Sequence, residues 1–365
     1  MEAADFGLPL VEGVPPATPT VAVIGNFDGV HLGHQRLISR ARASADQVAG
    51  ELMAVSFVPH PRLVLNPHLQ LALLTPTESK RRWLSRYGVD RLLILPFNDF
   101  LKNLSPAEFL DRIRARFNLV AIVAGPRVSI GRGGAGGLDF MSSYCERNRV
   151  ELVVVEPVLE PTGAVSSTRV RERLLAADLS AVAGMLGRPF SVIGEVVHGD
   201  GRGRQLGFPT ANLELEPLQA LPPDGVYVMR AKLLDGRSLP AVGSIGSRPQ
   251  FGPGTKKFEV NCLEAPGDLY GQRICVDVLH FLRGQEVFAS IDRLVEQMSR
   301  DVGLAKAQLE GAGPPVALPP AAPYTETTES APGGGGFGSP LREGRKNQRH
   351  DDGDDQTSIL PLGGG

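Results

Sequence analysis

The 365-residue sequence predicts an α/β domain with a parallel sheet, followed by an antiparallel β-barrel domain and a disordered tail. Up to about Leu186, short β-branched runs alternate with helical patterns, which is typical of βαβ units. After Pro189, strand-like runs follow one another without helices between them, which favours a barrel. Beyond about Gly311 the chain is rich in Pro, Gly and Thr and cannot bury enough apolar surface to order itself. We therefore expect a leader over residues 1–18, domains over 19–186 and 187–310, and a tail over 311–365.

The first domain should be a Rossmann-like sheet covered by helices. Its expected strands are Val21–Ile24, Leu52–Val58, Arg91–Leu95, Val120–Ala124 and Leu152–Val155, and its expected helices are Gln35–Ala49, Glu78–Tyr87 and Ser105–Phe117. The last helix opens Ser-Pro-Ala-Glu, with proline at the first helical position.

The second domain should be a barrel closed by a C-terminal helix. Its expected strands are Phe190–Val197, Gly225–Leu234, Ser238–Ile245, Phe258–Leu263 and Gln272–Leu282. Asp235-Gly236 predicts a hairpin in which both turn positions have positive φ. Residues 290–309 place apolar side chains on one face of a helix, which we expect to pack on the barrel: Ile291, Leu294, Val295, Met298 and Val302.

Composition excludes several classes of function. Lys plus Arg number 38 and Asp plus Glu 40, so the net charge of -2 argues against a nucleic-acid partner. The three cysteines (Cys145, Cys262, Cys275) are widely spaced and odd in number, which fits neither a disulfide framework nor a zinc site. No targeting signal and no apolar run of about 20 residues is present, so we expect a cytoplasmic protein without membrane contact. Self-association and a partner for the tail are left open.

A glycine-rich turn, Gly25-Asn-Phe-Asp-Gly-Val-His-Leu-Gly-His34, joins the first strand to the first helix. Such a turn directs backbone N–H groups and the positive helix end toward one spot, where a phosphate chain can bind. His31 and His34 add donors there, and Gly33 lets the backbone approach the ligand. Fixed donors would stabilise the charge that grows when a phosphate attacks the α-phosphorus of ATP.

A second glycine-rich run, Gly199-Asp-Gly-Arg-Gly-Arg-Gln-Leu-Gly207, precedes Pro209-Thr-Ala-Asn212. Flexible backbone beside guanidinium groups suits phosphate. The hydroxyl of Thr210 and the amide oxygen of Asn212 are hard ligands that can hold Mg²⁺ together with substrate phosphates.

These two runs resemble those of the prokaryotic bifunctional riboflavin kinase/FMN adenylyltransferases (FAD synthetases). The resemblance covers about Val21 to Gln308 and continues at Ser56–Pro61, Leu104–Phe109, Val165–Arg171, Asp224–Tyr227, Ile245–Pro249, Phe258–Val260, Asp268–Gly271 and Phe281–Arg283. It implies that the barrel phosphorylates riboflavin to FMN with MgATP. It also implies that the α/β domain adenylylates FMN to FAD and releases pyrophosphate.

The resemblance further implies a role for each site residue. His31, His34 and Arg171 would stabilise the transition state of adenylyl transfer, and Glu259 would take the proton of the riboflavin 5′-hydroxyl. The other expected contacts are to ATP or phosphate (Gly25, Asn26, Phe27, Asp28, Gly33, Ser166, Ser167, Thr168, Arg169, Gly203, Arg204, Gly207, Pro209), to flavin (His60, Pro61, Arg127, Asp268, Tyr270) and to metal (Thr210, Asn212).

The chain departs from the family pattern in one loop and at two barrel positions. Where the family has Gly-x-Asn/Asp-Phe-x-Phe-Gly, this chain has Arg127, Val128 and Ile130. The lost polar contact would cost about 1 to 3 kcal/mol and lost stacking about 0.5 to 1.5 more. Alternatively, Arg127 binds a phosphate and rescues or redirects the site. Asn261 stands where histidine is common in the family, and Ser244 where asparagine is common.

Three hypotheses follow. The first is the bifunctional enzyme, with riboflavin, FMN and ATP as substrates. The second is a riboflavin kinase whose nucleotidyltransferase domain is impaired or altered at Arg127. The third is a non-catalytic flavin- or nucleotide-binding regulator, which the histidine pair disfavours because a binder has no use for transition-state donors.

Overall fold

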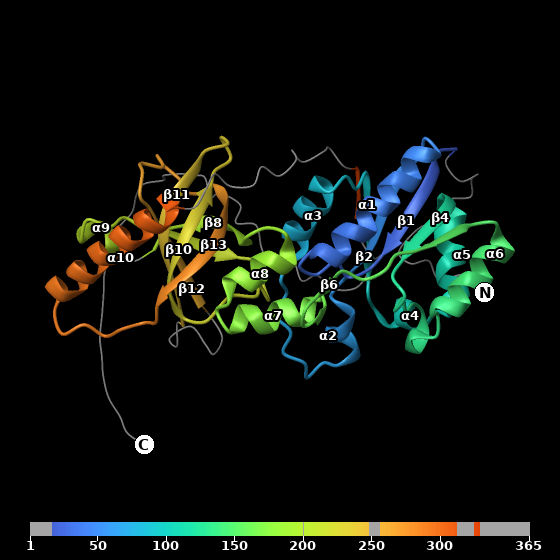
Figure 1. Ribbon diagram of the computed structural model, residues 1–365, viewed down its shortest axis with the longest axis horizontal. Coiled ribbons are helices and arrows are strands. Elements are labelled where there is room, and N and C mark those ends of the chain that lie inside the picture. Colours follow the sequence, from blue (N-terminus) through green and yellow to red (C-terminus); the bar gives the residue numbers. More distant parts are fainter. Residues whose placement is uncertain (1–16, 200, 248–255, 312–324, 329–365) are drawn as a thin grey trace, which may run out of the picture. The chain divides into compact units, whose positions relative to one another are not determined.

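The computed structural model describes residues 17–199, 201–247, 256–311 and 325–328 (Figure 1). The described residues belong to one compact unit, so the boundary at 186/187 stays a prediction. Most of the expected leader and most of the expected tail lie outside the described residues.

The N-terminal part is the expected parallel sheet, with strand order β14-β3-β2-β1-β4-β5. The strands are β1 (Pro19–Ile24), β2 (Glu51–Val58), β3 (Arg91–Pro96), β4 (Asn118–Ala124), β5 (Glu151–Val154) and β14 (Thr325–Thr328). Residues 325–328, where no ordered structure was expected, pair in parallel with the edge strand β3.

Helices cover both faces of this sheet because neighbouring strand residues point to opposite sides. In β1, Val21 and Val23 pack with α1 and α3, whereas Ala22 packs with α5 and α6. The helices are α1 (Leu32–Gln47), α2 (Pro61–Leu65), α3 (Thr77–Arg86), α4 (Asp99–Asn103), α5 (Pro106–Arg116), α6 (Leu138–Asn148), α7 (Ser167–Leu175) and α8 (Leu179–Leu186), with a 3-10 turn η1 (Arg132–Gly134) and a small hairpin β6 (Leu159–Glu160) and β7 (Gly163–Ala164). The start of α5 is the predicted one, and Ser105 and Glu108 form a capping box.

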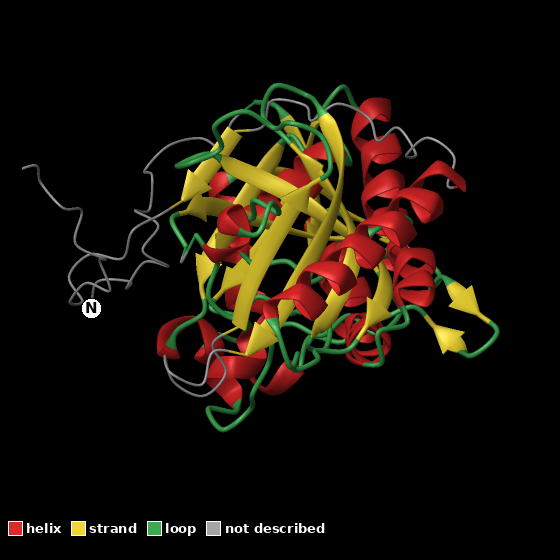
Figure 2. Cartoon of the chain, turned by 90° about the vertical axis from the view of Figure 1, so that its left-hand side faces the viewer, coloured by secondary structure: helices red, strands yellow, loops and turns green. Residues whose placement is uncertain are grey.

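The C-terminal part is the expected closed antiparallel barrel, with order β10-β11-β12-β9-β8-β13 (Figure 2). Its elements are β8 (Phe190–Val197), α9 (Arg202–Gln205), β9 (Ala211–Leu215), β10 (Gly225–Lys232), β11 (Ser238–Ser247), β12 (Lys256–Cys262), β13 (Arg273–Arg283) and α10 (Ile291–Gly311). The sequence patterns missed β9, whose residues were read only as a binding motif.

Helix α10 packs on the barrel as predicted, because Ala305 and Val302 meet Val226, Val228 and Val242 of the outer barrel face. Ile291 is an exception within the predicted apolar face, since it begins the helix and is 66% exposed.

The hairpin at Asp235-Gly236 forms between β10 and β11, but its turn differs from the predicted one. Gly236 alone has positive φ (89°), and the Asp235 side chain accepts the Arg237 backbone N–H at 2.9 Å. The longer turn, closed by Leu233 N–H to the Arg237 carbonyl at 2.9 Å, removes the need for a second positive φ.

Candidate active sites

The glycine-rich turn lies at the carboxyl edge of the parallel sheet, between β1 and α1. In the strand order, β1 is flanked by β2 and β4, so the direction of strand succession reverses beside it. Ligands of open α/β sheets bind at such a switch point. The turn carries positive φ at Phe27 (48°), Gly29 (87°) and Val30 (39°). Strained non-glycine backbone of this kind clusters at functional sites. We call residues 25–34 and the side chains around them, in direct contact or one side chain away, the turn site.

His31 and His34 stack on each other in the turn site, with ring centroids 3.7 Å apart. His31 is the N-cap residue of α1 and is buried, and the edge of His34 meets Phe27. A Cβ on Gly33 would lie 3.1 Å from the His31 ring, so a side chain at this position would crowd the imidazole. The Nδ1 atoms of both rings are buried without a hydrogen-bond partner among the described residues.

Both imidazoles are neutral at pH 7. Burial and then Arg188 lower the pKa of His31 to about 4, and burial with His31, Lys80 and Arg188 lowers the pKa of His34 well below 6.5. A neutral imidazole carries one N–H, so each ring offers one donor to an anion.

Asp28 ties the turn to the start of helix α7. Its carboxylate forms an ion pair with Arg171 and accepts the Thr75 backbone N–H at 2.9 Å. Ser167 of α7 donates from its hydroxyl to the Asp28 carbonyl at 2.8 Å. Burial raises the pKa of Asp28, and Arg171 opposes it. The structure thus brings His31, His34, Ser167 and Arg171 together, as the sequence predicted.

Other predicted residues of the first domain take different positions. Ser166 caps α7, accepting the Arg169 N–H at 3.4 Å, and Thr168 is exposed. The Arg169 guanidinium binds the β6–β7 hairpin through the carbonyls of Gly163 (2.6 Å) and Ala164 (3.0 Å), so it does not reach the turn in this structure.

The backbone of the turn is held by the neighbouring strand. Gly25 N–H donates to the Val55 carbonyl at 3.0 Å, and the Asn26 carbonyl accepts from Ser56 Oγ at 3.4 Å. His60 lies after β2, where its Nδ1 accepts the Arg62 N–H at 3.2 Å and caps α2, whose first residue is Pro61. Burial lowers the pKa of His60 to about 4, followed by the charges of Lys80 and Arg171, so this ring also lies near the turn site.

Three residues of the turn site were missed by the sequence analysis. Thr75 Oγ1 accepts the Gly29 N–H at 2.8 Å, and Arg188 donates to the Gly29 carbonyl at 2.8 Å while lying over the Trp83 ring at 3.9 Å. Lys80, on α3, is buried and donates to Ser56 Oγ at 3.1 Å. No motif marks these residues, and only their burial beside the turn distinguishes them.

The divergent loop after β4 divides into exposed and core positions. Arg127 is exposed, whereas Val128 is half-buried and Ile130 is buried in the core cluster that contains Phe109 and Met141. Ile130 pairs with Gly136 through backbone hydrogen bonds of 3.2 and 2.9 Å. The aliphatic residue at 130 therefore packs inside the domain.

The second site is on the barrel strands β9 and β12. Glu259 lies directly opposite Asn212 in the antiparallel pair and opposite Ser244 on β11. Directly opposed residues point to the same face. We call Glu259, Asn212 and Ser244 the barrel site. Ser244 Oγ donates to Glu259 Oε2 at 3.3 Å, and Lys257 forms an ion pair with the same carboxylate.

Asn212 has a buried amide oxygen that no described group satisfies. The side chain is 9% exposed, and its Oδ1 is buried without a partner among the described residues. A Cβ on Gly199 would lie 2.1 Å from the Asn212 Nδ2, so only glycine fits there. Asn261 donates to the Pro209 carbonyl at 2.7 Å and so holds the segment that leads to Thr210.

Several predicted residues line a pocket of about 380 Å³ next to this segment: Arg204, Pro209, Thr210, Asp268 and Tyr270. The Tyr270 ring stacks on His198 at 3.9 Å, and Asp268 accepts the Tyr270 N–H at 3.1 Å. Glu259 does not line the pocket, because its neighbour Val260 points into the barrel core and Glu259 to the other face. Thr210, two residues before Asn212, lines the pocket.

The remaining predicted positions of this part form the turn around α9. Gly203 lies against the Phe208 carbonyl, where a Cβ would come within 2.4 Å, and Gly207 has a φ of 84°. Asp200 of the glycine-rich run, and Arg248 and Pro249 of the predicted Ile245–Pro249 motif, lie outside the described residues.

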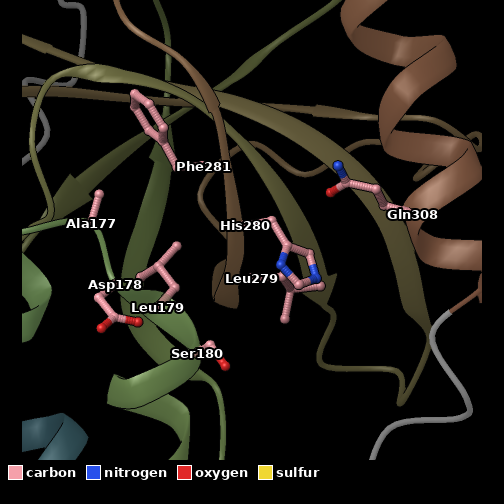
Figure 3. Close-up of a pocket in the computed structure, with 8 residues that line it drawn as sticks. All are labelled: Ala177, Asp178, Leu179, Ser180, Leu279, His280, Phe281 and Gln308. Atoms are coloured by element: carbon pink, nitrogen blue, oxygen red, sulfur yellow. The ribbon is translucent and has the colours of Figure 1, made fainter.

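A larger pocket of about 560 Å³ contains none of the predicted site residues (Figure 3). It is lined by Asp178 and Ser180 near the start of α8, by His280 and Phe281 of β13 and by Gln308 of α10. The described helices include none long and apolar enough to cross a membrane.

Within the described residues, no group of three or more His, Cys, Asp or Glu could hold a metal ion. A divalent cation would therefore depend on Thr210, the unpartnered Asn212 Oδ1 and substrate phosphates, a donor set that suits Mg²⁺.

Known protein families match both the N-terminal and the C-terminal part of the chain. A family model described as FAD synthetase matches residues 15–169, and one described as riboflavin kinase matches residues 186–309. The bifunctional riboflavin kinase/FMN adenylyltransferase of Pseudomonas fluorescens is 39% identical over 79% of this chain and 92% of its own length. Those of Bacillus subtilis and Escherichia coli K12 are each 33% identical, over 77% and 78% of this chain and 90% and 91% of theirs.

A solved structure shares the whole architecture. A protein of Streptococcus pneumoniae, described as a macrolide-efflux protein, superposes with a TM-score of 0.72 and 31% identity, over 81% of this chain and 96% of its own. The described fold is therefore shared over both the sheet and the barrel.

Proposed function

The chain belongs to the family of bifunctional riboflavin kinase/FMN adenylyltransferases, and we propose that the barrel site and the turn site divide its two reactions between them. The enzyme phosphorylates riboflavin to FMN with ATP, and it adenylylates FMN to FAD with release of pyrophosphate. One observation supports the assignment of sites: each carries buried side-chain atoms without a partner, Nδ1 of the histidine pair and Oδ1 of Asn212, at positions where a ligand was predicted.

In the kinase reaction, Glu259 takes the proton of the riboflavin 5′-hydroxyl while the oxygen attacks the γ-phosphorus and ADP leaves. Ser244 and Lys257 hold the carboxylate in position for this role. Thr210 and Asn212 would hold Mg²⁺, which would neutralise phosphate charge. Arg204 contributes positive charge at the rim of the neighbouring pocket. Tyr270 and Asp268 offer a flat surface and an acceptor there, which suit a flavin and equally a nucleotide base.

In the adenylyltransferase reaction, the FMN phosphate attacks the α-phosphorus of ATP and pyrophosphate leaves. His31 and His34 donate one hydrogen bond each to phosphate oxygens, and Arg171 adds charge from the start of α7. Gly25, Asn26, Phe27, Asp28 and Gly33 shape the turn, and Asp28 acts by orienting Arg171. His60 and Pro61, which follow β2 at the same edge, would contact the flavin. No covalent intermediate is needed.

The experiment that tests this proposal follows both products by chromatography. Purified protein is incubated with riboflavin and MgATP, and separately with FMN and MgATP. We expect FMN and FAD from the first reaction and FAD from the second. Glu259→Gln should abolish the first reaction only, and Glu264→Gln, an exposed carboxylate nearby, is the matched control. No difference between Glu259→Gln and wild type would refute the role of Glu259.

The exposure of Arg127 keeps one alternative open to test, a weakened or altered adenylyltransferase. If the loop limits the reaction, Arg127→Asn with Val128→Phe should raise FAD formation. Val128 is half-buried and packs against the core cluster that contains Phe109 and Met141. A phenylalanine ring at position 128 could pack against the same cluster, so the double variant should fold. Unchanged FAD formation would mean that the loop does not limit the reaction.

The three cysteines are free, which suits the reducing cytoplasm that we propose as the location of the protein.

A further inference from the structure

Lys80 is a buried cation that the two reactions, as described, do not use. Its side chain lies on α3, the residue is 6% exposed, and its ammonium donates to the neutral hydroxyl of Ser56 at 3.1 Å. An ammonium has three donors, and burying its charge without a counter-ion is costly. Among the described residues no carboxylate forms an ion pair with it. Lys80 thus has the capacity to bind an anion.

The two carboxylates that stabilise its charge are committed to other groups. Asp28 pairs with Arg171, and Glu216 accepts the Glu78 backbone N–H at 3.2 Å at the start of α3. Both act on Lys80 through space, and neither neutralises it by direct contact.

The ammonium of Lys80 lies close to the turn, separated from it by the side chain of Ser56. Ser56, its hydrogen-bond partner, also donates to the Asn26 carbonyl at 3.4 Å, so the ammonium lies one side chain away from the turn. Its field acts on Asp28 and His34 of the turn and on His60, which follows β2 at the same edge of the sheet.

The other cations of the site are already engaged. Arg171 is paired with Asp28, and the two terminal nitrogens of Arg188 donate to the carbonyls of Gly29, Val30 and Leu186, whereas its Nε is buried without a partner among the described residues. With both histidines neutral, Lys80 adds to the charge of Arg171 a cation that, among the described residues, is held by the Ser56 hydroxyl and by no carboxylate.

We propose that Lys80 is a further phosphate-binding residue of the adenylyltransferase site, and that its ammonium binds the phosphate chain of the nucleotide from the β2 side of the turn. This inference rests on the adenylyltransferase function assigned to the turn site. Binding would satisfy the remaining donors of the ammonium and would place fixed positive charge where the pyrophosphate leaves. Lys80 takes no proton and forms no bond in this role.

The charge state of Lys80 gives this role a signature in the pH profile. Burial lowers the pKa of Lys80 to about 8, while Asp28 and Glu216 raise it. The ammonium is therefore present below pH 8 and lost above it. We expect kcat/KM of FAD formation to fall as the pH rises through about 8. Removing the Glu216 charge should move this fall to lower pH, although Glu216 belongs to the barrel part and does not contact the turn.

The test compares Lys80→Met, which keeps the length without the charge, with Lys80→Arg, which keeps the charge at any accessible pH. Lys306→Met on the exposed side of α10 is the matched control. FAD formation from FMN is measured between about pH 6.5 and 9.5, and riboflavin phosphorylation is measured on the same samples. The affinity for inorganic pyrophosphate is measured by calorimetry, which reports binding without turnover.

We expect Lys80→Met to lower kcat/KM for FAD formation and to weaken pyrophosphate binding by about 10- to 100-fold, as for a lost charged hydrogen bond. Kinase activity should not change. Lys80→Arg should restore part of the activity and remove the alkaline fall, and Glu216→Gln should shift it to lower pH. Equal pyrophosphate affinity in wild type and Lys80→Met would overturn the proposal, as would an unchanged alkaline fall in Lys80→Arg or a parallel loss of kinase activity. Absence of FAD from the wild type with Lys80-dependent pyrophosphate binding would refute the adenylyltransferase function alone.

Discussion

The ion pair between Asp28 and Arg171 should contribute both to the stability of the α/β part and to FAD formation. In the present chain the Thr75 N–H donates to Asp28 Oδ1 at 2.9 Å. Replacing Asp28 with Asn removes the charge but keeps an oxygen that can accept this hydrogen bond. The pair is buried, with side-chain exposures of 3% and 14%, so the small value of a surface ion pair does not apply. Breaking one partner of such a pair costs about 3 to 5 kcal/mol. Because Arg171 keeps its 2.7 Å bond to the Ala72 carbonyl, we expect about 3 kcal/mol.

A double-mutant cycle separates the pair from its surroundings. Arg171→Met leaves the Asp28 carboxylate without its main counter-charge and should cost a similar amount. The double variant Asp28→Asn/Arg171→Met leaves neither charge of this pair without its partner, so its cost should fall short of the sum of the single costs by about 1 to 3 kcal/mol. The free energy of unfolding is measured in urea through Trp83, the sole tryptophan, which is buried in the α/β part.

The two activities show whether the effect is local. FAD formation should fall in all three variants because Arg171 loses either its position or its charge. FMN formation should persist, since the barrel site shares no side chain with this pair. If the cost of the double variant equals the sum of the single costs within about 0.5 kcal/mol, the two residues are not coupled and the reasoning is wrong.

Three further predictions concern single residues. Glu259→Gln should lower the rate of FMN formation about 100-fold or more, as for a removed general base, while FAD formation from FMN stays unchanged, and equal losses in both assays would refute the separation of sites. Gly199→Ala would place a Cβ 2.1 Å from the Asn212 amide and should abolish kinase activity, whereas Gly284→Ala, with no atom within 4 Å, should be silent in the same assay. The pKa of His31 is lowered to about 4, so the unfolded chain takes up a proton below pH 6.5 that the folded chain does not. Stability should therefore fall between pH 6.5 and 4 by roughly 3 kcal/mol from this residue, and urea unfolding of His31→Asn should lack that part.

The strands of both parts could be predicted because burial on one or both faces leaves a local pattern. The expected strand Phe190–Val197 coincides with β8, and the sheet strands agree to within about two residues. Strand β9 could not be predicted, because Ala211–Leu215 is short and follows a proline and a binding motif. Its place opposite Glu259 depends on pairing with a strand far along the chain, which no local pattern specifies.

The site residues divide in the same way. His31, His34, Asp28 and Arg171 stand in motifs, and the structure brings them together. Lys80 has no motif, and in a helical sequence it reads as an ordinary solvated lysine. Its significance follows from burial beside three segments that meet only in the folded chain, so it could not have been found from the sequence.

Departures from a family pattern gain meaning from the contacts of the substituted residues. Ser244 takes a position where asparagine is common, yet its hydroxyl donates to Glu259, and Asn261 holds Pro209 by a 2.7 Å hydrogen bond. Both residues thus make a hydrogen bond at or beside the barrel site. Ile130, in contrast, is turned into the core, so an aromatic residue at this position would be a packing residue before it could be a flavin contact. Of the three changes in the loop, Arg127 is the exposed one, and it is the change through which we expect the loop to alter substrate binding.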